Sequence, residues 1–361
     1  MSMTSVLRSS IQRATFVAVV GFGLVSQFAA AEPVVEARTK VAHGGIYELV
    51  YNPASNSVLV AAAGMRGAEN PGRVVELDAV TLQQRKEYDV SQAPFYGLGL
   101  NTRTQRLYGT ATRSGSVEVL DLASGKIIAS IGENAHTRQL VVDEANNTVY
   151  VSVVGSRNPN AETQVPSELW VIDGNSNVLS KRYEIPGALA GLDVDVAGGR
   201  AFMTDLNANE VVVVDLKSGN VLNRWPTSGA SSINVDYDAA SNRLFVANQG
   251  SGTLSVLNAQ NGELLAHVET GAGAHGVLFN AAGNQVYVAN RQASTTTVVD
   301  GTSYQVVAQL ETGTLPQSLT IDTAANIVFT NSKARGLPRN APADAVPVVD
   351  ENGDIVVRIR P

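Results

Sequence analysis

Residues 238–248 read DAASNRLFVAN, a five-residue turn followed by an apolar run of β type. The pattern recurs from Asn280 as NAAGNQVYVAN, and in more divergent form at five other places. The seven turns open at Asn52, Asn101, Asp143, Asp195, Asp238, Asn280 and Asp322. Asn and Asp suit this first position because their side chains accept hydrogen bonds from the amides of the turn. We therefore assign these residues a structural role and no chemistry.

A second turn follows about 20 residues after several of these marks, at Asp121, Asp215, Asn258 and Asp300. Each repeat of about 42 residues thus predicts four short strands in an antiparallel meander. Such a unit cannot bury both of its faces alone, so neighbouring units must stack around an axis. The sequence therefore predicts an all-β protein, a seven-bladed β-propeller with four antiparallel strands per blade.

The last blade requires a strand from the other end of the chain. The run AVPVVD is a poor third strand, because Pro347 would stand in a strand that is paired on both sides. We expect Ile355–Arg360 to be the third strand and residues 34–41 to supply the outer one. This arrangement closes the last blade with the N-terminal strand and leaves no free edge in the ring.

Composition excludes several classes of function. The 361 residues include no cysteine, so there is no thiolate nucleophile and no metal site with Cys ligands. Asp and Glu number 33 against 26 Lys and Arg, and this net charge of −7 argues against a dedicated duplex-DNA protein. No motif in the chain indicates a catalytic centre, so we expect no enzyme activity, no metal and no cofactor.

The first 31 residues have the layout of a secretory signal peptide. Arg8 and Arg13 precede an apolar stretch that ends in Ala29-Ala30-Ala31. We expect cleavage after Ala31, a periplasmic location and a single propeller domain over residues 32–361. No second stretch is long and apolar enough to span a membrane, so the mature protein should have no membrane span. We also expect it to be a monomer.

The strands at Phe245 and Tyr287, which read FVAN and YVAN, resemble the YVTN-type β-propeller repeat. The runs GGIYELVY before Asn52 and RQLVVDEANNTVY from Arg138 resemble the bacterial YncE-like periplasmic proteins more closely. The resemblance covers about residues 33–361, although repeats 1 and 2 depart from the YVAN pattern. It implies a seven-bladed propeller, export and no established reaction. It also implies single-stranded DNA as a ligand, because members of the group have been proposed to bind it.

One face of the propeller should carry the function. All variation in length falls between the second and third strands of a blade, in the loops 64–73, 155–167 and 332–353. Function tends to lie on variable loops that a rigid scaffold presents. The loops between second and third strands, short and long together, also carry the candidate cations Arg66, Arg73, Arg113, Arg157, Arg291, Lys333, Arg335 and Arg339.

The residue just before each innermost strand should face the mouth of the axial channel on this side. These residues are Tyr47, Tyr96, Arg138, Ala190, Ser231, His275 and Gln317. Small side chains would suffice for packing there, so the tyrosines, arginine and histidine indicate a binding site. Phe95 stands beside Tyr96, and Asn248, Asn290 and Asn331 end second strands, where they can cap a loop or contact a ligand.

We therefore predict a non-enzymatic binding or scaffold module that uses its upper loops and the channel mouth. The candidate site comprises Tyr47, Phe95, Tyr96, Arg113, Arg138, Arg157, His275, Arg291, Gln317, Asn248, Asn290 and Asn331. Aromatic rings interleaved with cations suit a small anionic ligand or single-stranded nucleic acid. The partner could equally be a periplasmic protein. The remaining alternative is a propeller enzyme such as a lactonase or a quinone-dependent dehydrogenase.

Overall fold

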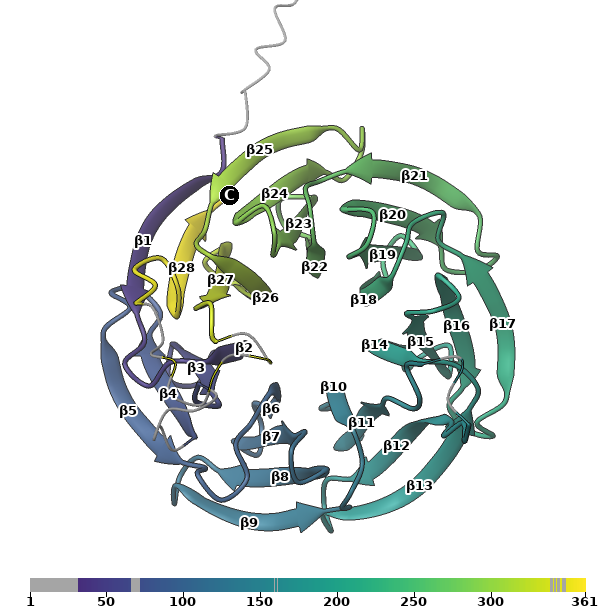
Figure 1. Cartoon of the computed structure of the whole chain (residues 1–361), viewed down its shortest axis with the longest axis horizontal. Helices are drawn as coiled ribbons and strands as arrows, with labels where there is room; N and C mark the ends of the chain where they lie inside the picture. The colour runs from purple at the N-terminus through teal and green to yellow at the C-terminus, as the bar shows by residue number, and fades with distance from the viewer. Residues whose placement is uncertain are drawn as a thin grey trace, which may run out of the picture. The chain divides into compact units, whose positions relative to one another are not determined.

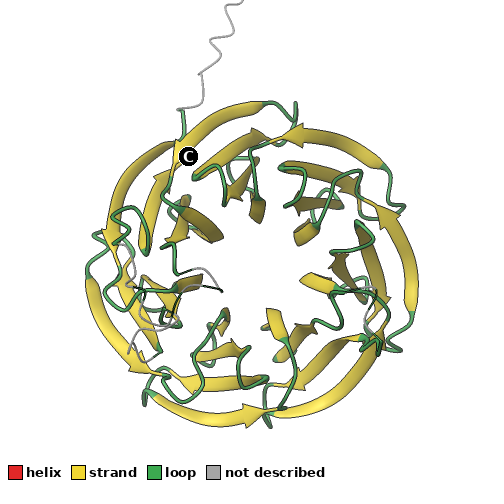
Figure 2. Cartoon of the chain, in the orientation of Figure 1, coloured by secondary structure: helices red, strands yellow, loops and turns green. Residues whose placement is uncertain are grey.

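The computed structural model describes residues 32–65, 72–158, 160, 162–337, 340, 342, 345 and 349–361. Glu32–Pro361 forms one compact unit, and the predicted signal peptide lies outside the described residues. Within the described ranges the regular structure consists of 28 strands (Figure 2). None of these residues forms a helix of the length and apolarity that crossing a membrane requires.

The strands form seven four-stranded antiparallel sheets around a central axis (Figure 1). Blade 1 contains β2 (Ile46–Asn52), β3 (Ser57–Ala62), β4 (Arg73–Asp78) and β5 (Gln84–Asp89). Blade 2 contains β6 (Gly97–Asn101), β7 (Arg106–Ala111), β8 (Ser116–Asp121) and β9 (Lys126–Ile131). Blade 3 contains β10 (Thr137–Asp143), β11 (Thr148–Val153), β12 (Ser167–Asp173) and β13 (Val178–Ile185).

The next three blades repeat the same order from the axis outward. Blade 4 contains β14 (Leu189–Asp195), β15 (Arg200–Asp205), β16 (Glu210–Asp215) and β17 (Val221–Pro226). Blade 5 contains β18 (Ser232–Asp238), β19 (Arg243–Asn248), β20 (Thr253–Asn258) and β21 (Leu264–Glu269). Blade 6 contains β22 (Ala274–Asn280), β23 (Gln285–Asn290), β24 (Thr295–Asp300) and β25 (Val306–Glu311). The seven-bladed propeller predicted from the repeats is confirmed.

Blade 7 joins the two ends of the chain, as predicted. It contains β26 (Leu315–Asp322), β27 (Ile327–Lys333), β28 (Ile355–Arg360) and, as its outer strand, β1 (Val34–Lys40). β1 pairs antiparallel with β28, from Val34 opposite Arg360 to Lys40 opposite Ile355. Glu36 adds ion pairs to Arg358 and Arg360 across this pairing. The ring is therefore closed by a full strand ladder between its first and last strands.

The seven turns that open with Asn or Asp connect the first and second strands of each blade. The fifth residue of each turn has a left-handed backbone, with φ between 47° and 68°; these residues are Asn56, Gln105, Asn147, Gly199, Asn242, Asn284 and Asn326. Asn and Gly tolerate this region best, which explains their frequency here. The first side chain accepts amide hydrogen bonds, as Asp238 does from Ala240 at 3.1 Å. The predicted structural role is confirmed.

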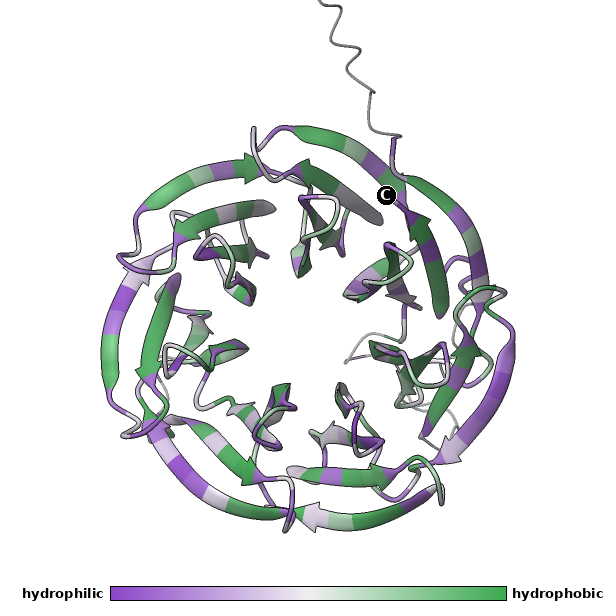
Figure 3. Cartoon of the chain, turned by 180° about the vertical axis from the view of Figure 1, so that it is seen from behind, coloured by the Kyte–Doolittle hydropathy of each residue, from purple (hydrophilic) through white to green (hydrophobic). Residues whose placement is uncertain are grey.

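The core lies between the blades. Among the described residues, buried apolar side chains form seven clusters, each drawn mainly from two adjacent blades. Strand β3 shows the reason, because Val58 and Val60 pack toward blade 7 whereas Leu59 packs toward blade 2. Side chains alternate across a strand, so each blade buries both of its faces. In Figure 3 most of the outermost strands carry both hydrophilic and hydrophobic residues.

The two ends of the channel differ in their connections. We call lower face the end with the turns between first and second strands and between third and fourth strands. The upper face carries the links between second and third strands and between blades. The three long links follow β3, β11 and β27, where they were predicted. The rigid ring thus presents its variable segments on the upper face only.

Candidate binding site at the channel mouth

The channel mouth is lined by residues five positions before the end of each innermost strand. Tyr47, Tyr96, Arg138, His275 and Gln317 hold this place in blades 1, 2, 3, 6 and 7, and all five line one cavity of about 530 Å³. Ala190 and Ile233 hold it in blades 4 and 5 and are buried among apolar side chains. Ser231 was the residue predicted for blade 5. It stands seven positions before the end of β18, so that assignment was wrong by two positions, and Ile233 holds the place instead.

Phe95 does not line the mouth. It is fully buried in the cluster between blades 1 and 2. Its ring lies against Gly109, where an added Cβ would stand 2.1 Å from the Phe95 Cδ2 atom. Successive residues of an extended chain point in opposite directions, so Tyr96 in the cavity requires Phe95 in the core. Phe95 is therefore a packing residue.

The three predicted asparagines at the ends of second strands tie strands together. Asn248 accepts from the Ser232 hydroxyl and donates to the Ser255 hydroxyl, both at 2.8 Å. Asn290 donates in the same way to Thr297 Oγ1 at 2.9 Å. The Asn331 side-chain oxygen accepts from the Ser318 amide at 3.0 Å. All three are fully buried, so they support the links rather than contact a ligand.

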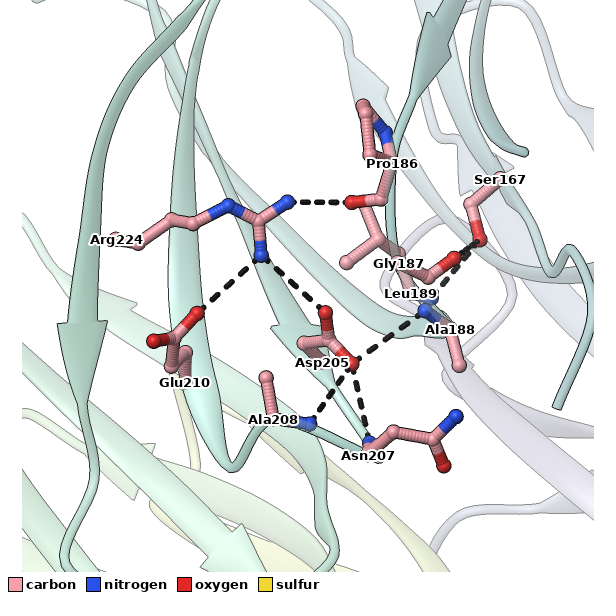
Figure 4. A network of polar contacts seen from close by, with 10 residues as sticks. All are labelled: Ser167, Pro186, Gly187, Ala188, Leu189, Asp205, Asn207, Ala208, Glu210 and Arg224. Atoms are coloured by element: carbon pink, nitrogen blue, oxygen red, sulfur yellow. Dashed lines mark hydrogen bonds and ion pairs between the residues drawn. The ribbon is translucent and has the colours of Figure 1, made fainter. Parts of the chain in front are cut away.

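Blade 4 has a carboxylate, Asp205, where these blades have Asn (Figure 4). Asp205 accepts hydrogen bonds from the amides of Ala188, Asn207 and Ala208. It also pairs with Arg224 at 3.3 Å, and the same guanidinium group contacts Glu210 at 3.3 Å and donates to the Pro186 carbonyl (Figure 4). The charge of Arg224 is thus neutralised within the blade.

Arg138 and Arg291 form a contrasting pair of cations in the cavity. Among the described residues, neither guanidinium group has a carboxylate oxygen within 4.0 Å, and Arg291 Nε has no hydrogen-bond partner. Arg138 lies on β10 of blade 3, and Arg291 follows β23 of blade 6, on the far side of the axis (Figure 1). Two partly buried cations therefore face the cavity from opposite sides of the axis.

Arg157 and two histidines surround these cations. Arg157 lies at the exposed rim and donates to His136 Nε2 at 2.9 Å. Burial lowers the pKa of His136 and of His275, and the nearby arginines lower both further. Burial also lowers the pKa of Arg138 to about 10, with Arg157 contributing. At neutral pH the histidines are therefore uncharged, while the arginines keep their positive charge.

Two tyrosines form the aromatic part of the mouth. The ring centroids of Tyr47 and Tyr96 lie 4.6 Å apart, edge to face at 63°. Lys333 Nζ stands 3.8 Å from the Tyr47 centroid and donates to its hydroxyl. The guanidinium group of Arg113 lies 5.6 Å from the Tyr96 centroid. Each ring thus already has a cation partner from the upper loops.

Other candidate cations lie elsewhere. Arg73 is engaged with Asp89 at 2.8 Å and with Glu87 at 3.7 Å on blade 1. Arg335 lines a separate hollow beside the link that follows β27. Arg66 and Arg339 lie outside the described residues. The cation set of the mouth consequently comes from blades 2, 3, 6 and 7.

The cavity also holds three acidic side chains that were not anticipated, Glu48, Asp193 and Asp236. Asp193 accepts from the Tyr237 amide at 2.7 Å, and Asp236 accepts from the Phe279 amide. Each therefore satisfies a backbone donor of the next blade. Burial and the proximity of the two groups raise the pKa of Asp193, and burial raises that of Asp236. The described residues include no group of three or more His, Asp or Glu that could hold a metal ion.

The sequence did contain a signal for these three acids, because each is a charged residue inside an innermost strand. Asp193 and Asp236 stand two positions before the strand end, where the other blades have Val, Gly, Leu or Thr. Glu48 stands four positions before the end of β2. Acidic residues at these places depart from the apolar or small residues expected of a packed channel wall. The sequence prediction considered only the residue just before each innermost strand, and it therefore did not include these three acids.

The comparisons with known proteins agree with this architecture. A family model described as YNCE-like beta-propeller matches residues 158–338, half of the chain, and the chain belongs to this family. The uncharacterized protein YncE of Escherichia coli (strain K12) is 29% identical over 239 residues, covering 62% of this chain and 65% of that protein. The Salmonella typhi protein of the same name is 27% identical over 283 residues, covering 63% and 77%. The chain thus matches about two thirds of the length of its Escherichia coli relative.

Solved structures share the fold at low sequence identity. The beta-propeller domain of Myceliophteria thermophila Cps50 (Swd1) superposes with a TM-score of 0.66 and 10% identity, over 91% of this chain and 99% of that one. Kuenenia stuttgartiensis hydrazine synthase gives a TM-score of 0.68 and 15% identity, over 81% and 94%. At these identities the likeness extends to the fold alone.

Proposed function

We propose that this protein is a non-enzymatic binding module that takes a small anionic ligand at the mouth of its channel. The observation that carries the proposal is the pair of guanidinium groups of Arg138 and Arg291, which face one cavity and, among the described residues, have no carboxylate oxygen within 4.0 Å. Desolvated cations without counterions are costly unless an anion joins them. Arginine also offers planar, paired donors that match carboxylate and phosphate oxygens.

The size of the cavity favours a compact ligand. About 530 Å³ lies within the range of small-molecule sites. The walls combine arginine donors with the apolar side chains of Leu192, Val277 and Leu319. Such a mixture suits an anion carried on a small organic framework.

Single-stranded nucleic acid is the second candidate, because the mouth presents tyrosines and cations together. Two observations rank it below a small anion. The cations converge on one cavity at the channel mouth rather than along a groove that could follow a phosphate backbone. The rings of Tyr47 and Tyr96 contact each other, Lys333 and Arg113, which reduces the surface available for stacking bases.

The proposal places the module in the periplasm. Its support is the leader-like sequence of residues 1–31, with Arg8, Arg13 and the small residues before Glu32. The non-enzymatic part rests on the histidines of the mouth. His136 accepts from Arg157, and His275 donates to the Gln317 carbonyl at 3.2 Å, so neither is directed at a nucleophile.

The test is binding of sulfate to the full-length chain, measured by calorimetry at constant ionic strength. Wild type should bind, and Arg138→Gln and Arg291→Gln should each weaken binding by about tenfold or more, since a charge-assisted hydrogen bond contributes about 1.5–3 kcal/mol. A labelled single-stranded oligonucleotide of about ten nucleotides is tested in parallel.

Arg103→Gln is the matched control, because it removes one exposed arginine from the lower face. It should bind sulfate like wild type, which separates the mouth from general effects of net charge. Equal sulfate binding by all four proteins, or none by wild type, would contradict the proposal. Oligonucleotide binding that depends on both arginines, without sulfate binding, would establish the second candidate instead.

A further inference from the structure

Glu48 of blade 1 lines the cavity together with Arg138, Arg291 and Gly97, the residue of blade 2 at the same level. Glu48, Gly97 and Gln139 stand four positions before the ends of β2, β6 and β10. An added Cβ at Gly97 would lie 2.4 Å from the Arg138 carbonyl oxygen. Blades 2 and 3 therefore approach each other closely at this level. Glu48 hydrogen-bonds to Gln139 of blade 3 and lies close enough to Arg138 for their charges to interact.

Glu48 is the acid of the cavity that interacts with Arg138. Its pKa is raised to about 7 by burial, against the opposing effects of the Gln139 hydrogen bond and the charge of Arg138. Asp193 and Asp236 differ, because they are bonded to backbone amides and to each other. Near neutral pH a modest change of the local field therefore changes the charge of Glu48.

The surroundings of Glu48 include several other charged or titratable groups. Its own strand contributes Tyr47, blade 2 contributes Tyr96, and blade 3 contributes His136, Arg138 and Arg157; Asp193, Asp236, His275 and Arg291 face the cavity from blades 4, 5 and 6. Lys333 and Arg113 stand over the tyrosine rings. The histidines are neutral at pH 7, and water screens Arg157 at the exposed rim.

Charge balance then constrains the ligand. Arg138 and Arg291 together carry two positive charges, and an ionised Glu48 reduces the sum over these three groups to one. Asp193 and Asp236 are held by backbone amides of the next blade and are left out of this sum. A monoanion matches that state without any change at Glu48. A dianion matches the two arginines only when Glu48 is neutral, and its negative charge also disfavours an ionised carboxylate nearby.

We propose that the mouth binds a compact dianion together with one proton, which Glu48 takes from solvent as the ligand enters. This inference rests on the proposed function and names its ligand class. Affinity for a dianion should be highest at low pH, where Glu48 already holds the proton. Above about pH 7 the affinity should fall by up to about tenfold per pH unit, because binding must then protonate the carboxylate.

The experiment is isothermal titration calorimetry of the full-length chain with sodium sulfate, which stays dianionic throughout. Titrations in two buffers of equal pH but different ionisation enthalpy give the number of protons taken up. Wild type should take up a large fraction of one proton per sulfate at about pH 7.5 and little at about pH 5.5. Methanesulfonate, a monoanion, should bind with little proton uptake at either pH.

The variant Glu48→Gln keeps the shape of the side chain and its contact with Gln139 but cannot titrate. It should bind sulfate with little proton uptake and an affinity nearly independent of pH. Equal proton uptake by wild type and E48Q would overturn the assignment to Glu48, as would sulfate binding by wild type without uptake at about pH 7.5. Should E48Q fail to fold, the wild-type pH profile decides alone. Absence of sulfate binding at both pH values contradicts the proposed function itself.

Discussion

Arginine has opposite roles at the two ends of the propeller. On the lower face Arg200 pairs with Asp195 at 2.6 Å and donates to the Ala259 carbonyl of the next blade at 2.7 Å. Arg243 repeats this arrangement with Asp238 and the carbonyl of Gly301. At the upper mouth Arg138 and Arg291 have no such carboxylate partner among the described residues. The paired arginines thus join neighbouring blades, whereas Arg138 and Arg291 form the proposed anion site.

The same contrast holds for the acids. Burial alone would raise the pKa of Asp195, but hydrogen bonds from Arg200 and the Gly198 amide outweigh it and lower the pKa. Burial prevails at Glu48, where the partners are fewer, and the pKa is raised to about 7. The lower face is thus built from fixed charges that stabilise the fold. At the mouth, by contrast, the charge of Glu48 changes with pH near neutrality.

The largest expected effect comes from breaking a lower-face pair. Asp195→Ala leaves the half-buried Arg200 without its partner and should lower the free energy of unfolding by about 3 kcal/mol. Urea denaturation measures it. Asp121→Ala is the control and should cost less. It removes a half-exposed acid of another lower-face turn that accepts hydrogen bonds from Ser124 but, among the described residues, forms no ion pair within 4.0 Å. Similar losses in both variants would show that the Asp195–Arg200 pair has no special role.

The pH dependence of stability should separate the two ends of the channel. Glu48 has a higher pKa in the folded chain than when unfolded, so its contribution is full below about pH 4.5 and is lost as pH rises through 7. Asp195 acts in the reverse sense, and its contribution is lost in acid. Between about pH 5 and 8, Glu48→Gln should therefore gain on the order of 2 kcal/mol relative to wild type. The measurement is denaturation of both proteins across this pH range. If the stabilities of wild type and Glu48→Gln changed in parallel with pH, the raised pKa of Glu48 would be disproved.

A smaller effect is expected from replacing single arginines by methionine of similar length. Without added anions, Arg138→Met should raise the unfolding free energy by about 1 kcal/mol, because an unpaired cation is removed from a site kept for function. Arg200→Met should lower it, since Asp195 then loses its partner. Thermal melting in chloride-based buffer compares the two. A loss of stability in both would mean that Arg138 also supports the fold.

The smallest effect is expected at Asp205, the paired acid of the upper face. Asp205→Asn restores the residue of blades 5, 6 and 7 at this place. Arg224 keeps Glu210 at 3.3 Å, and both side chains are partly exposed, so the loss should stay below about 1 kcal/mol. Urea denaturation beside wild type measures it. A loss comparable with that of Asp195→Ala would erase the distinction between the two faces.

The chain's sequence was sufficient for the blades and for their closure. Turns such as 238–242 are local, since the side chain at the first position and the backbone at the fifth are set within five residues. The strands that follow have a period of two, which does not depend on distant partners. Pro347 excluded one pairing of the last blade, and the pairing of β1 with β28 remained.

Only the tertiary structure decided which side chains meet in the mouth. Glu48 and Gln139 are separated by a whole blade in the sequence, and they come into contact because their innermost strands face one channel and blades 2 and 3 approach closely at Gly97. Phe95 and Tyr96 are neighbours in the link before β6, yet the first side chain lies in the core and the second lines the cavity. The local rules that build each blade do not determine these outcomes. They follow from how seven blades close on one axis, where residues from distant repeats come to share a single charged cavity.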